Sequence, residues 1–243
     1  MVKIEKIALQ NFRCFSEFEL LFDAETTVIV AENGCGKTSV FDSVRYLLWL
    51  LLAQFPQVPT QRPTREDLRV SPFALHFDYE AETRIAFPAA AFLILRAYAQ
   101  LDFGLSELPM PSVEWDFTLR RDKATIPEKG VRLAQLMDAM KPLLMASAEG
   151  QFPQDGYPVF AAFGTSRAVI RQVPKSRRGF RKAFSRWDAY RGALNGELDY
   201  RRLVEWVAWL DDAALREMKA RRDVDYRSLE QRTIDLALKR MLP

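Results

Sequence analysis

The residues Asn33-Gly34-Cys35-Gly36-Lys37-Thr38 have the types and the spacing needed to hold a polyphosphate. A polyphosphate carries several negative charges in a small volume, so its site needs converging backbone N–H groups, the positive end of a helix dipole and a lysine. Gly34 and Gly36 let the backbone curl round the β-phosphate without a Cβ in the way, and the Lys37 ammonium reaches the β- and γ-phosphates. The Thr38 hydroxyl is suited to ligate Mg²⁺. We therefore predict a site for ATP and Mg²⁺ with Lys37 as the catalytic residue, Thr38 as the metal ligand, and further nucleotide contacts from Asn33, Gly34, Cys35, Gly36 and Ser39.

Ala31 stands where the usual pattern GxxxxGK[ST] opens with glycine. It occupies the turn before the two glycines that come closest to phosphate, and a methyl group fits there if φ stays negative. The alternative is a chance Gly-Lys-Thr at a junction between a loop and a helix. The apolar run before the loop and the apolar helical pattern after it favour a nucleotide site.

The elements that must hold this loop follow from hydrophobic periodicity. Residues 26–30 are β-branched and apolar, as expected of a buried central strand, and apolar residues after Thr38 recur at helical spacing. Alternation predicts an antiparallel strand pair at 2–9 and 18–22. Further predicted elements are an antiparallel lobe with strands at 74–79, 84–87, 92–98 and 113–119, of which 92–98 could equally be helical, then a helix at 128–148 and a buried strand at 159–163.

Composition limits the class of protein. Hydrophobic residues make up 49% of the 243, enough for a well-buried core. The N-terminus has no apolar signal region, and the longest apolar run, 46–53, is far shorter than the roughly 20 residues that cross a bilayer. We expect a soluble, cytoplasmic protein with no membrane partner. Two cysteines are too few for a disulfide framework, and a single histidine argues against a histidine-based zinc site or catalytic triad.

Positive charge is concentrated between residues 167 and 191, where nine basic residues face the single acid Asp188. Aromatic residues interleave at spacings of three or four, which predicts a helix with one apolar and one cationic face. That cationic face is either solvated or a surface for a phosphate backbone or an acidic partner. The residues that would form the surface are Arg177, Arg178, Arg181 and Lys182.

The first fifty residues carry a family resemblance. The order of a strand, Asn11-Phe12-Arg13-Cys14-Phe15, an acidic second strand and VIVAENGCGKTSVFDSVRYLL resembles the N-terminal half of the ATPase heads of the SMC, RecF and OLD group, ABC-type enzymes of DNA repair and phage defence. The later PVFAAFGTSR at 158–167, and the spacing of Arg186, Tyr190 and LVEWVAWL at 203–210, are more specifically similar to PtuA-type defence ATPases of Septu and some retron systems.

The resemblance implies an α/β fold: a P-loop NTPase core of the ABC type with an antiparallel β lobe, followed by a mostly helical C-terminal region. The corresponding regions are 1–66, 67–170 and 171–243. It also implies that Arg13 contacts nucleotide phosphate or a base edge. Partners implied in the same way are a second copy in a dimer or higher oligomer of ATPase heads, a nuclease, and nucleic acid.

Several parts of such an ATPase are missing from the sequence. The predicted strand 159–163 has no glutamine at its end, since Gln172 lies further on, and neither a signature motif like LSGGQ nor an apolar strand ending in Asp-Glu is found. Only WVAWLDD at 206–212 imitates the latter, and its apolar residues fall at helical spacing, which predicts a helix. We therefore expect an incomplete head, lacking its C-terminal half, that binds ATP but hydrolyses it negligibly by itself.

Three functions are compatible with these residues. The first is part of an ABC-type ATPase whose nucleotide state gates a DNA-acting partner. The second is a scaffold that binds nucleotide without hydrolysis and docks a nuclease or nucleic acid. The third is a P-loop kinase or another small NTPase, against which the Asn11–Phe15 element and the antiparallel lobe both argue.

Overall fold

The computed structural model divides the chain into two compact units, Met1–Phe160 and Ala161–Pro243, and each is described by itself. None of the described helices is long and apolar enough to cross a membrane. The residues that the structure describes are 2–56, 58–59, 61–70, 75–78, 83–86, 92–103, 112–120, 131–149, 157–164, 184–195 and 200–241.

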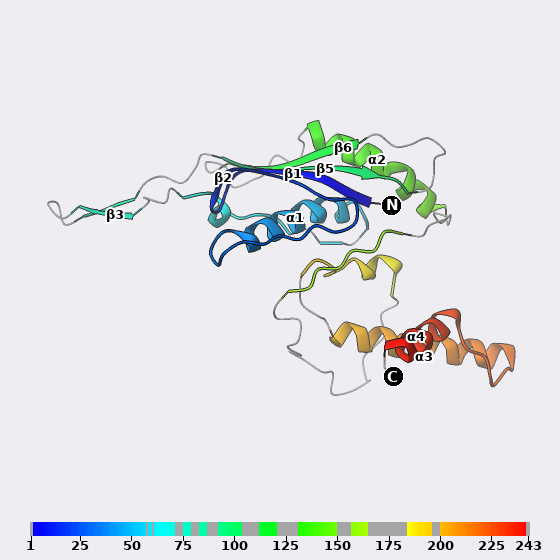
Figure 1. The fold of residues 1–243 in the computed structure, drawn as a ribbon. Coiled ribbons are helices and arrows are strands. Elements are labelled where there is room, and N and C mark those ends of the chain that lie inside the picture. The colour runs from blue at the N-terminus through cyan, green and yellow to red at the C-terminus, as the bar shows by residue number, and fades with distance from the viewer. Residues whose placement is uncertain are drawn as a thin grey trace. The chain divides into compact units, whose positions relative to one another are not determined.

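A four-stranded antiparallel sheet forms the first unit (Figure 1). Its strand order is β2-β1-β5-β6, so the N-terminal strand lies inside the sheet. Leu9 of β1 pairs with Phe18 of β2 on one side and with Leu95 of β5 on the other. The predicted regions 1–66 and 67–170 thus both contribute strands to one sheet. The strand bounds are Val2–Phe12 for β1, Phe15–Leu21 for β2, Phe92–Leu101 for β5 and Ser112–Arg120 for β6.

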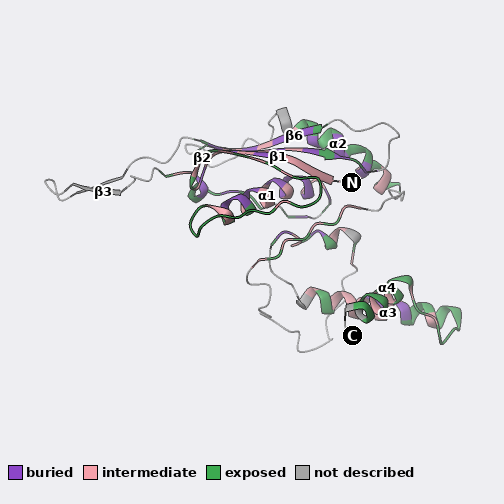
Figure 2. Ribbon diagram, in the orientation of Figure 1, coloured by how far each residue is buried: buried purple, intermediate pink, exposed green. Residues whose placement is uncertain are grey.

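One face of this sheet forms the core with helix α1, Lys37–Leu52. Strand residues alternate between buried and half-buried positions, as expected where one face is covered. The Trp115 indole N–H donates to the Leu47 carbonyl of α1 at 3.1 Å, which satisfies the one polar atom of a fully buried ring. Figure 2 shows buried residues along the strands and α1, whereas the loop leading into α1 is exposed.

The opposite face of the sheet carries cross-strand ion pairs. Lys6 pairs with Glu19 at 2.8 Å, and Arg96 lies 3.2 Å from Glu114. Glu5, at the irregularity in the pairing of β1 with β5, accepts hydrogen bonds from Gln100 and Ser112. Both ion pairs are diagonal, two residues out of register, and opposite charges on neighbouring strands each add a modest stabilisation.

The remaining elements of the first unit are α2, Val131–Ala148, and a separate antiparallel pair formed by β3, Leu75–Asp78, and β4, Thr83–Ala86. Helix α2 contacts β6 and buries Leu136, Met140 and Leu143. A short 3₁₀ helix, η1, spans Arg65–Asp67.

The second unit contains the 3₁₀ helix η3, Arg186–Ala189, and two α-helices: α3, Tyr200–Arg221, and α4, Leu229–Met241. Asp188 of η3 accepts a hydrogen bond from Arg202 of α3 at 2.9 Å, and the ring of Phe184 contacts Trp209. Asp211 of α3 accepts from Gln231 of α4 at 3.1 Å, which ties the two helices together.

Most predicted elements are confirmed. The strand pair at 2–9 and 18–22, the strands of the lobe and the helices after Thr38 and within 128–148 all form, with ends shifted by a few residues. Residues 92–98 are a strand, because they pair with β1 on one side and β6 on the other. The stretch 206–212 lies inside α3, as its helical spacing predicts.

Two predictions are wrong. Residues 26–30 and 159–163, both predicted to be buried strands, belong to no strand in the structure. Val28 and Val30 are 77% and 88% exposed, and Val159 is 92% exposed. A buried parallel strand needs a hydrogen-bonded neighbour on each side, and among the described residues no strand lies against either segment. The apolar composition of these two segments indicates a preference for burial, but it does not determine which strand would pair with them.

Candidate nucleotide-binding site

The predicted phosphate-binding loop, residues 31–37 and called the phosphate loop below, leads into α1 through two glycines in the left-handed region. Gly34 has φ +87° and Gly36 has φ +85°. Left-handed backbone costs an L-residue roughly 1–2 kcal/mol, so glycine is the residue suited to both positions. The Cys35 N–H donates to the Glu32 carbonyl at 3.3 Å, which closes the turn between the two ends of the loop.

Helix α1 begins at Lys37 with Gly36 as its N-cap and without a side-chain capping bond. The first N–H groups of an α-helix have no partner within the helix, and here no side chain takes their place. These groups and the helix dipole give a site for an anion. The predicted contact residues Asn33, Cys35 and Thr38 are exposed beside this end of the helix, whereas Ser39 is buried.

The Lys37 ammonium folds back over the phosphate loop. It donates to the backbone carbonyls of Ala31 at 2.5 Å and Glu32 at 2.7 Å. Among the described residues Lys37 has no carboxylate partner, so its positive charge is not neutralised by an ion pair. Backbone carbonyls are weaker partners for an ammonium than phosphate oxygens, because a carbonyl oxygen carries only a partial negative charge.

The turn between β1 and β2 lies against the phosphate loop. A Cβ built on Gly36 would stand 2.6 Å from the Cys14 Sγ and 2.6 Å from the Phe15 ring. Real side chains do not approach so closely, so a side chain at Gly36 would force Cys14 or Phe15 to shift and would also strain its left-handed φ. This contact brings the predicted residue Arg13, next to Cys14, into the neighbourhood of the loop.

Arg13 is bound to two carboxylates. Its Nη1 donates to Asp42 of α1 at 2.6 Å, and its Nε donates to Asp67 of η1 at 2.7 Å. Sequence reasoning missed both acids. Asp42 carries a signal that could have found it, because it is the only acidic residue in α1 and lies five residues after Lys37. Asp67, 54 residues from Arg13, carries none that a local pattern could show.

Tyr46 lies near the same charged cluster. Burial raises the pKa of the Tyr46 phenol above its ordinary value, and the negative charge of Asp67 raises it further. The edge of the Tyr46 ring meets Phe12, with 6.4 Å between ring centroids. A neutral phenol therefore borders the cluster at physiological pH.

The predicted basic surface lies outside the described residues, since Arg177, Arg178, Arg181 and Lys182 all fall between 165 and 183. Gln172 falls in the same range. The predicted site residues from Asn33 to Ser39 lie together at the start of α1. Arg13 precedes Cys14 and Phe15 in the chain, and these two residues lie against Gly36.

A family model described as an AAA domain matches residues 6–231, almost the whole chain. The chain belongs to this AAA domain family. The matched residues run from β1 through the phosphate loop and α1 to the start of α4. They include most of both compact units.

Two curated relatives share a short stretch with this AAA domain. Both are DNA double-strand break repair Rad50 ATPases, from Thermoplasma volcanium and Thermoplasma acidophilum, and each is 39% identical over 46 residues. The stretch is 19% of this chain and 5% of each relative. The chain therefore matches only a small part of the curated relatives' length.

Two solved structures match part of this chain. One belongs to work on ATP-driven dimerization and DNA-stimulated activation of SMC ATPases, with a TM-score of 0.37 and 16% identity over 58% of this chain and 80% of that one. The other is the Smc head domain of Pyrococcus furiosus with an extended coiled coil, bound to the C-terminal domain of ScpA. It has the same TM-score and identity, and the match covers 58% of this chain and 33% of that one.

Proposed function

We propose that this AAA domain binds ATP with Mg²⁺ as the N-terminal part of an ABC-type ATPase of the SMC, RecF and OLD group. One observation carries the proposal: an uncapped helix N-terminus follows two left-handed glycines, and the first residue of that helix is a lysine without a carboxylate partner among the described residues. Converging N–H groups, a helix dipole and an ammonium are what a polyphosphate requires.

Each residue of the phosphate loop has a role in this proposal. The backbone N–H groups of Gly34 and of Gly36 to Ser39 hold the phosphates, and the Lys37 ammonium leaves the Ala31 and Glu32 carbonyls for phosphate oxygens. The Thr38 hydroxyl, exposed at the start of α1, is the residue that would hold Mg²⁺. When bound, Mg²⁺ offsets the charge on the β- and γ-phosphates. Asn33 and Cys35 line the outer part of the loop.

Hydrolysis needs further groups that the described residues do not bring to the loop. In-line attack by water requires one carboxylate to orient the water and another to fix the metal shell. Asp211 and Asp212, the only acidic pair that follows an apolar run, lie within helix α3, and Asp211 already bonds Gln231. We therefore propose that a complementary polypeptide or further chain supplies these carboxylates, with active heads forming a dimer or higher oligomer.

The exposed apolar segments support the same view. Residues 26–30 lead directly into the phosphate loop, and their valines are mostly exposed. Residues 159–163 expose Val159 and Phe163 in the same way. Apolar segments of this kind are suited to pair with strands of a complementary polypeptide, since strand addition covers both their side chains and their backbone groups.

The proposed setting is DNA repair or anti-phage defence of the PtuA type, where the ATP state gates a DNA-acting partner such as a nuclease. The name of the Thermoplasma relatives, DNA double-strand break repair ATPase, supports the DNA-directed part. A second candidate is a scaffold that binds nucleotide without turnover and docks a nuclease or nucleic acid. The helical position of Asp211 and Asp212 favours it, because it leaves the described residues without a catalytic acidic pair.

Calorimetric titration of the purified chain with Mg²⁺ and ATP tests the proposal. Lys37→Ala should weaken ATP binding by about 2–4 kcal/mol, because several phosphate charges lose their main counter-charge. Lys141→Ala is the control, since Lys141 is an exposed lysine on α2 of the same unit. Equal ATP affinity for the unaltered chain and Lys37→Ala would refute the assignment of the site.

A phosphate-release assay distinguishes the two candidate functions. We expect negligible hydrolysis by the chain alone, because losing both carboxylates slows the reaction by several orders of magnitude. Turnover that appears on adding a complementary polypeptide supports the ATPase, and binding without turnover in every combination supports the scaffold. Sustained phosphate release by the chain alone that Lys37→Ala abolishes would contradict our reading of the missing carboxylates.

A further inference from the structure

Arg13 has a backbone conformation that its residue type disfavours. Its φ is +49°, in the left-handed region, and Asn11 two residues earlier has φ +53°. A non-glycine residue in this region costs on the order of 1–3 kcal/mol and persists only where its surroundings determine it. Such strain often accompanies a functional position. The contacts that hold Arg13 in this conformation therefore show which residues keep it in place.

Segment 64–69 holds the arginine turn, residues Arg13 and Cys14, through the backbone. The Arg13 N–H donates to the Asp67 carbonyl at 2.8 Å, and the Arg69 N–H donates to the Asn11 carbonyl at 2.9 Å. Phe12 and Leu68 form an isolated antiparallel bridge between these two bonds. The left-handed turn is thus fixed on both sides by a segment more than fifty residues away in sequence.

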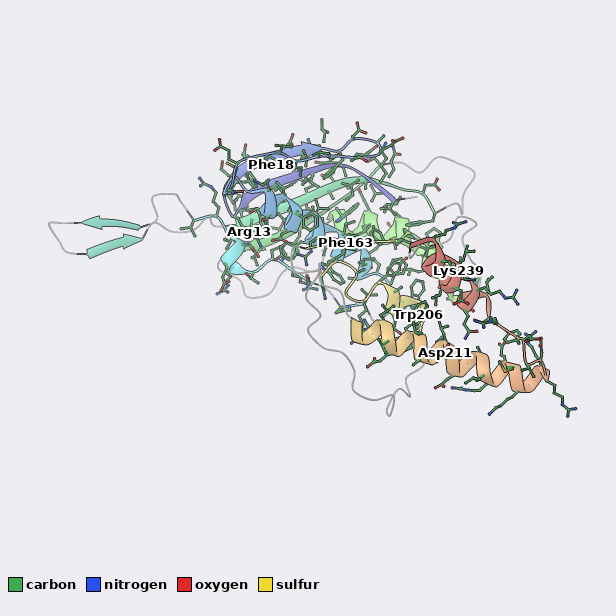
Figure 3. All side chains as sticks on the ribbon, turned by 60° about the horizontal axis from the view of Figure 1, so that its bottom comes forward. Arg13, Phe18, Phe163, Trp206, Asp211 and Lys239 are labelled. Atoms are coloured by element: carbon green, nitrogen blue, oxygen red, sulfur yellow. The ribbon has the colours of Figure 1, made fainter. Side chains whose placement is uncertain are left out.

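Asp67 also fixes the Arg13 side chain, and it is itself well held. Asp67 is only 6% exposed, and its second carboxylate oxygen accepts from the Thr64 N–H at 2.8 Å, in a capping box at the start of η1. A buried carboxylate without a positive partner is strongly destabilising, so Asp67 and Arg13 require each other. Figure 3 shows Arg13 beside the cyan segment that contains η1.

Asp42 provides the second anchor, from the helix that begins at the phosphate loop. It accepts from Arg13 at 2.6 Å through one oxygen and from Arg45 at 3.0 Å through the other. Burial lowers the pKa of Arg13, but the hydrogen bonds that Arg13 donates to Asp42 and Asp67, with the negative charges of both acids, outweigh it and leave that pKa raised. The guanidinium is therefore fixed by two acids on two different elements and stays charged.

The two anchors leave part of the guanidinium unused. Arginine has five N–H donors in a rigid planar fork, and here one on Nε and one on Nη1 are bonded to carboxylates. Among the described residues the other three donors have no acceptor. The two residues that follow Arg13, Cys14 and Phe15, lie against Gly36 of the phosphate loop, so the turn that carries this fixed fork borders the loop.

We propose that Asp67, assisted by Asp42, is a positioning residue for nucleotide binding: it holds the Arg13 fork so that its unused donors can meet a phosphate oxygen. The inference rests on the proposed function and goes beyond it by assigning a task to two acids that do not touch the nucleotide. A guanidinium already held in place loses little conformational freedom on binding, which increases the affinity it contributes.

A double-mutant cycle on ATP affinity tests this proposal, with calorimetry on the chain as the readout. Asp67→Asn keeps the side-chain size but removes the charge and one of the two acceptor oxygens. It should weaken ATP binding about tenfold. In the Arg13→Ala background the same substitution should change affinity by less than about twofold, because Asp67 acts through Arg13.

Asp188→Asn is a matched control. Asp188 has the same local task in η3, a capping box with Ser185, and likewise pairs with an arginine, Arg202. It should leave ATP affinity unchanged. Equal weakening by Asp67→Asn with and without Arg13, or no weakening at all, would overturn the positioning role. If Asp67→Asn does not fold, the same cycle with Asp42→Asn decides the matter by the same outcomes.

The two levels of the proposal fail differently. If the unaltered chain and Lys37→Ala bind ATP equally, the nucleotide site itself is wrong and the role of Asp67 falls with it. If Lys37→Ala loses affinity and Asp67→Asn does not, the nucleotide site stands and only the role of Asp67 is refuted.

Discussion

Alanine substitutions at the two left-handed glycines separate backbone strain from crowding. Gly34 and Gly36 have almost the same φ, +87° and +85°. Their surroundings differ: a Cβ at Gly34 would meet nothing within 4 Å, whereas at Gly36 it would overlap the Cys14 Sγ and the Phe15 ring, each at 2.6 Å. Gly34→Ala is therefore the matched control for Gly36→Ala.

The expected magnitudes follow from these contacts. Gly34→Ala should cost only the left-handed penalty, about 1–2 kcal/mol of unfolding free energy. Gly36→Ala should cost that amount and roughly 1–3 kcal/mol more, the usual range for forcing an extra methyl group into packed surroundings. The Phe15 ring cannot easily move aside, because it stacks on Phe18 with 4.5 Å between the centroids.

Urea unfolding of both variants without nucleotide measures the difference, with equal m-values as the condition for comparison. Adding Cys14→Ala to Gly36→Ala should recover part of the loss, since it removes one of the two overlapping atoms. Equal destabilisation by the two glycine substitutions would show that the turn between β1 and β2 does not pack on the phosphate loop. That result would also remove the contact on which we base the position of Arg13 near the phosphate loop.

Three further predictions concern other parts of the chain. Arg222, with φ +55°, follows α3 at the point where the Asp223 N–H donates to the Met218 carbonyl. Arg222→Gly should raise the unfolding free energy by about 0.5–1 kcal/mol in a urea titration, because glycine adopts this φ without strain. A decrease in unfolding free energy would contradict this explanation. The exposed thiols of Cys14 and Cys35 should both be alkylated in the free chain, and bound ATP should slow the reaction at Cys35. Mass spectrometry of the labelled peptides measures both rates. An unchanged rate at Cys35 with ATP would argue against phosphates in the loop. If residues 167–191 bind nucleic acid, the affinity should fall steeply as the salt concentration rises. Charge reversal at Arg177, Arg178, Arg181 and Lys182 should then weaken binding to all nucleic-acid sequences alike. A salt-independent interaction would instead indicate that these residues bind a protein partner.

The sequence by itself determined the features that depend on neighbours along the chain. The helix that begins at Lys37 and the tight glycine turn before it are predicted correctly, because glycine spacing and a 3.6-residue apolar pattern are local properties. The alternation of apolar and polar residues likewise predicts β1, β2 and β6. In a sheet with one covered face, successive residues of a strand point alternately to the covered face and to the other face. The helical spacing of residues 206–212 correctly excluded a strand there.

Only the tertiary structure decided which segments meet. Residues 26–30 have the composition of a buried strand, yet no described strand pairs with them, because an apolar run specifies a need for burial and not the partner that provides it. Arg13 was predicted as a site residue from the family resemblance, but its anchors Asp42 and Asp67 lie 29 and 54 residues away. No local period links positions so far apart; they meet because β1 ends beside both α1 and η1, which brings one guanidinium between two carboxylates.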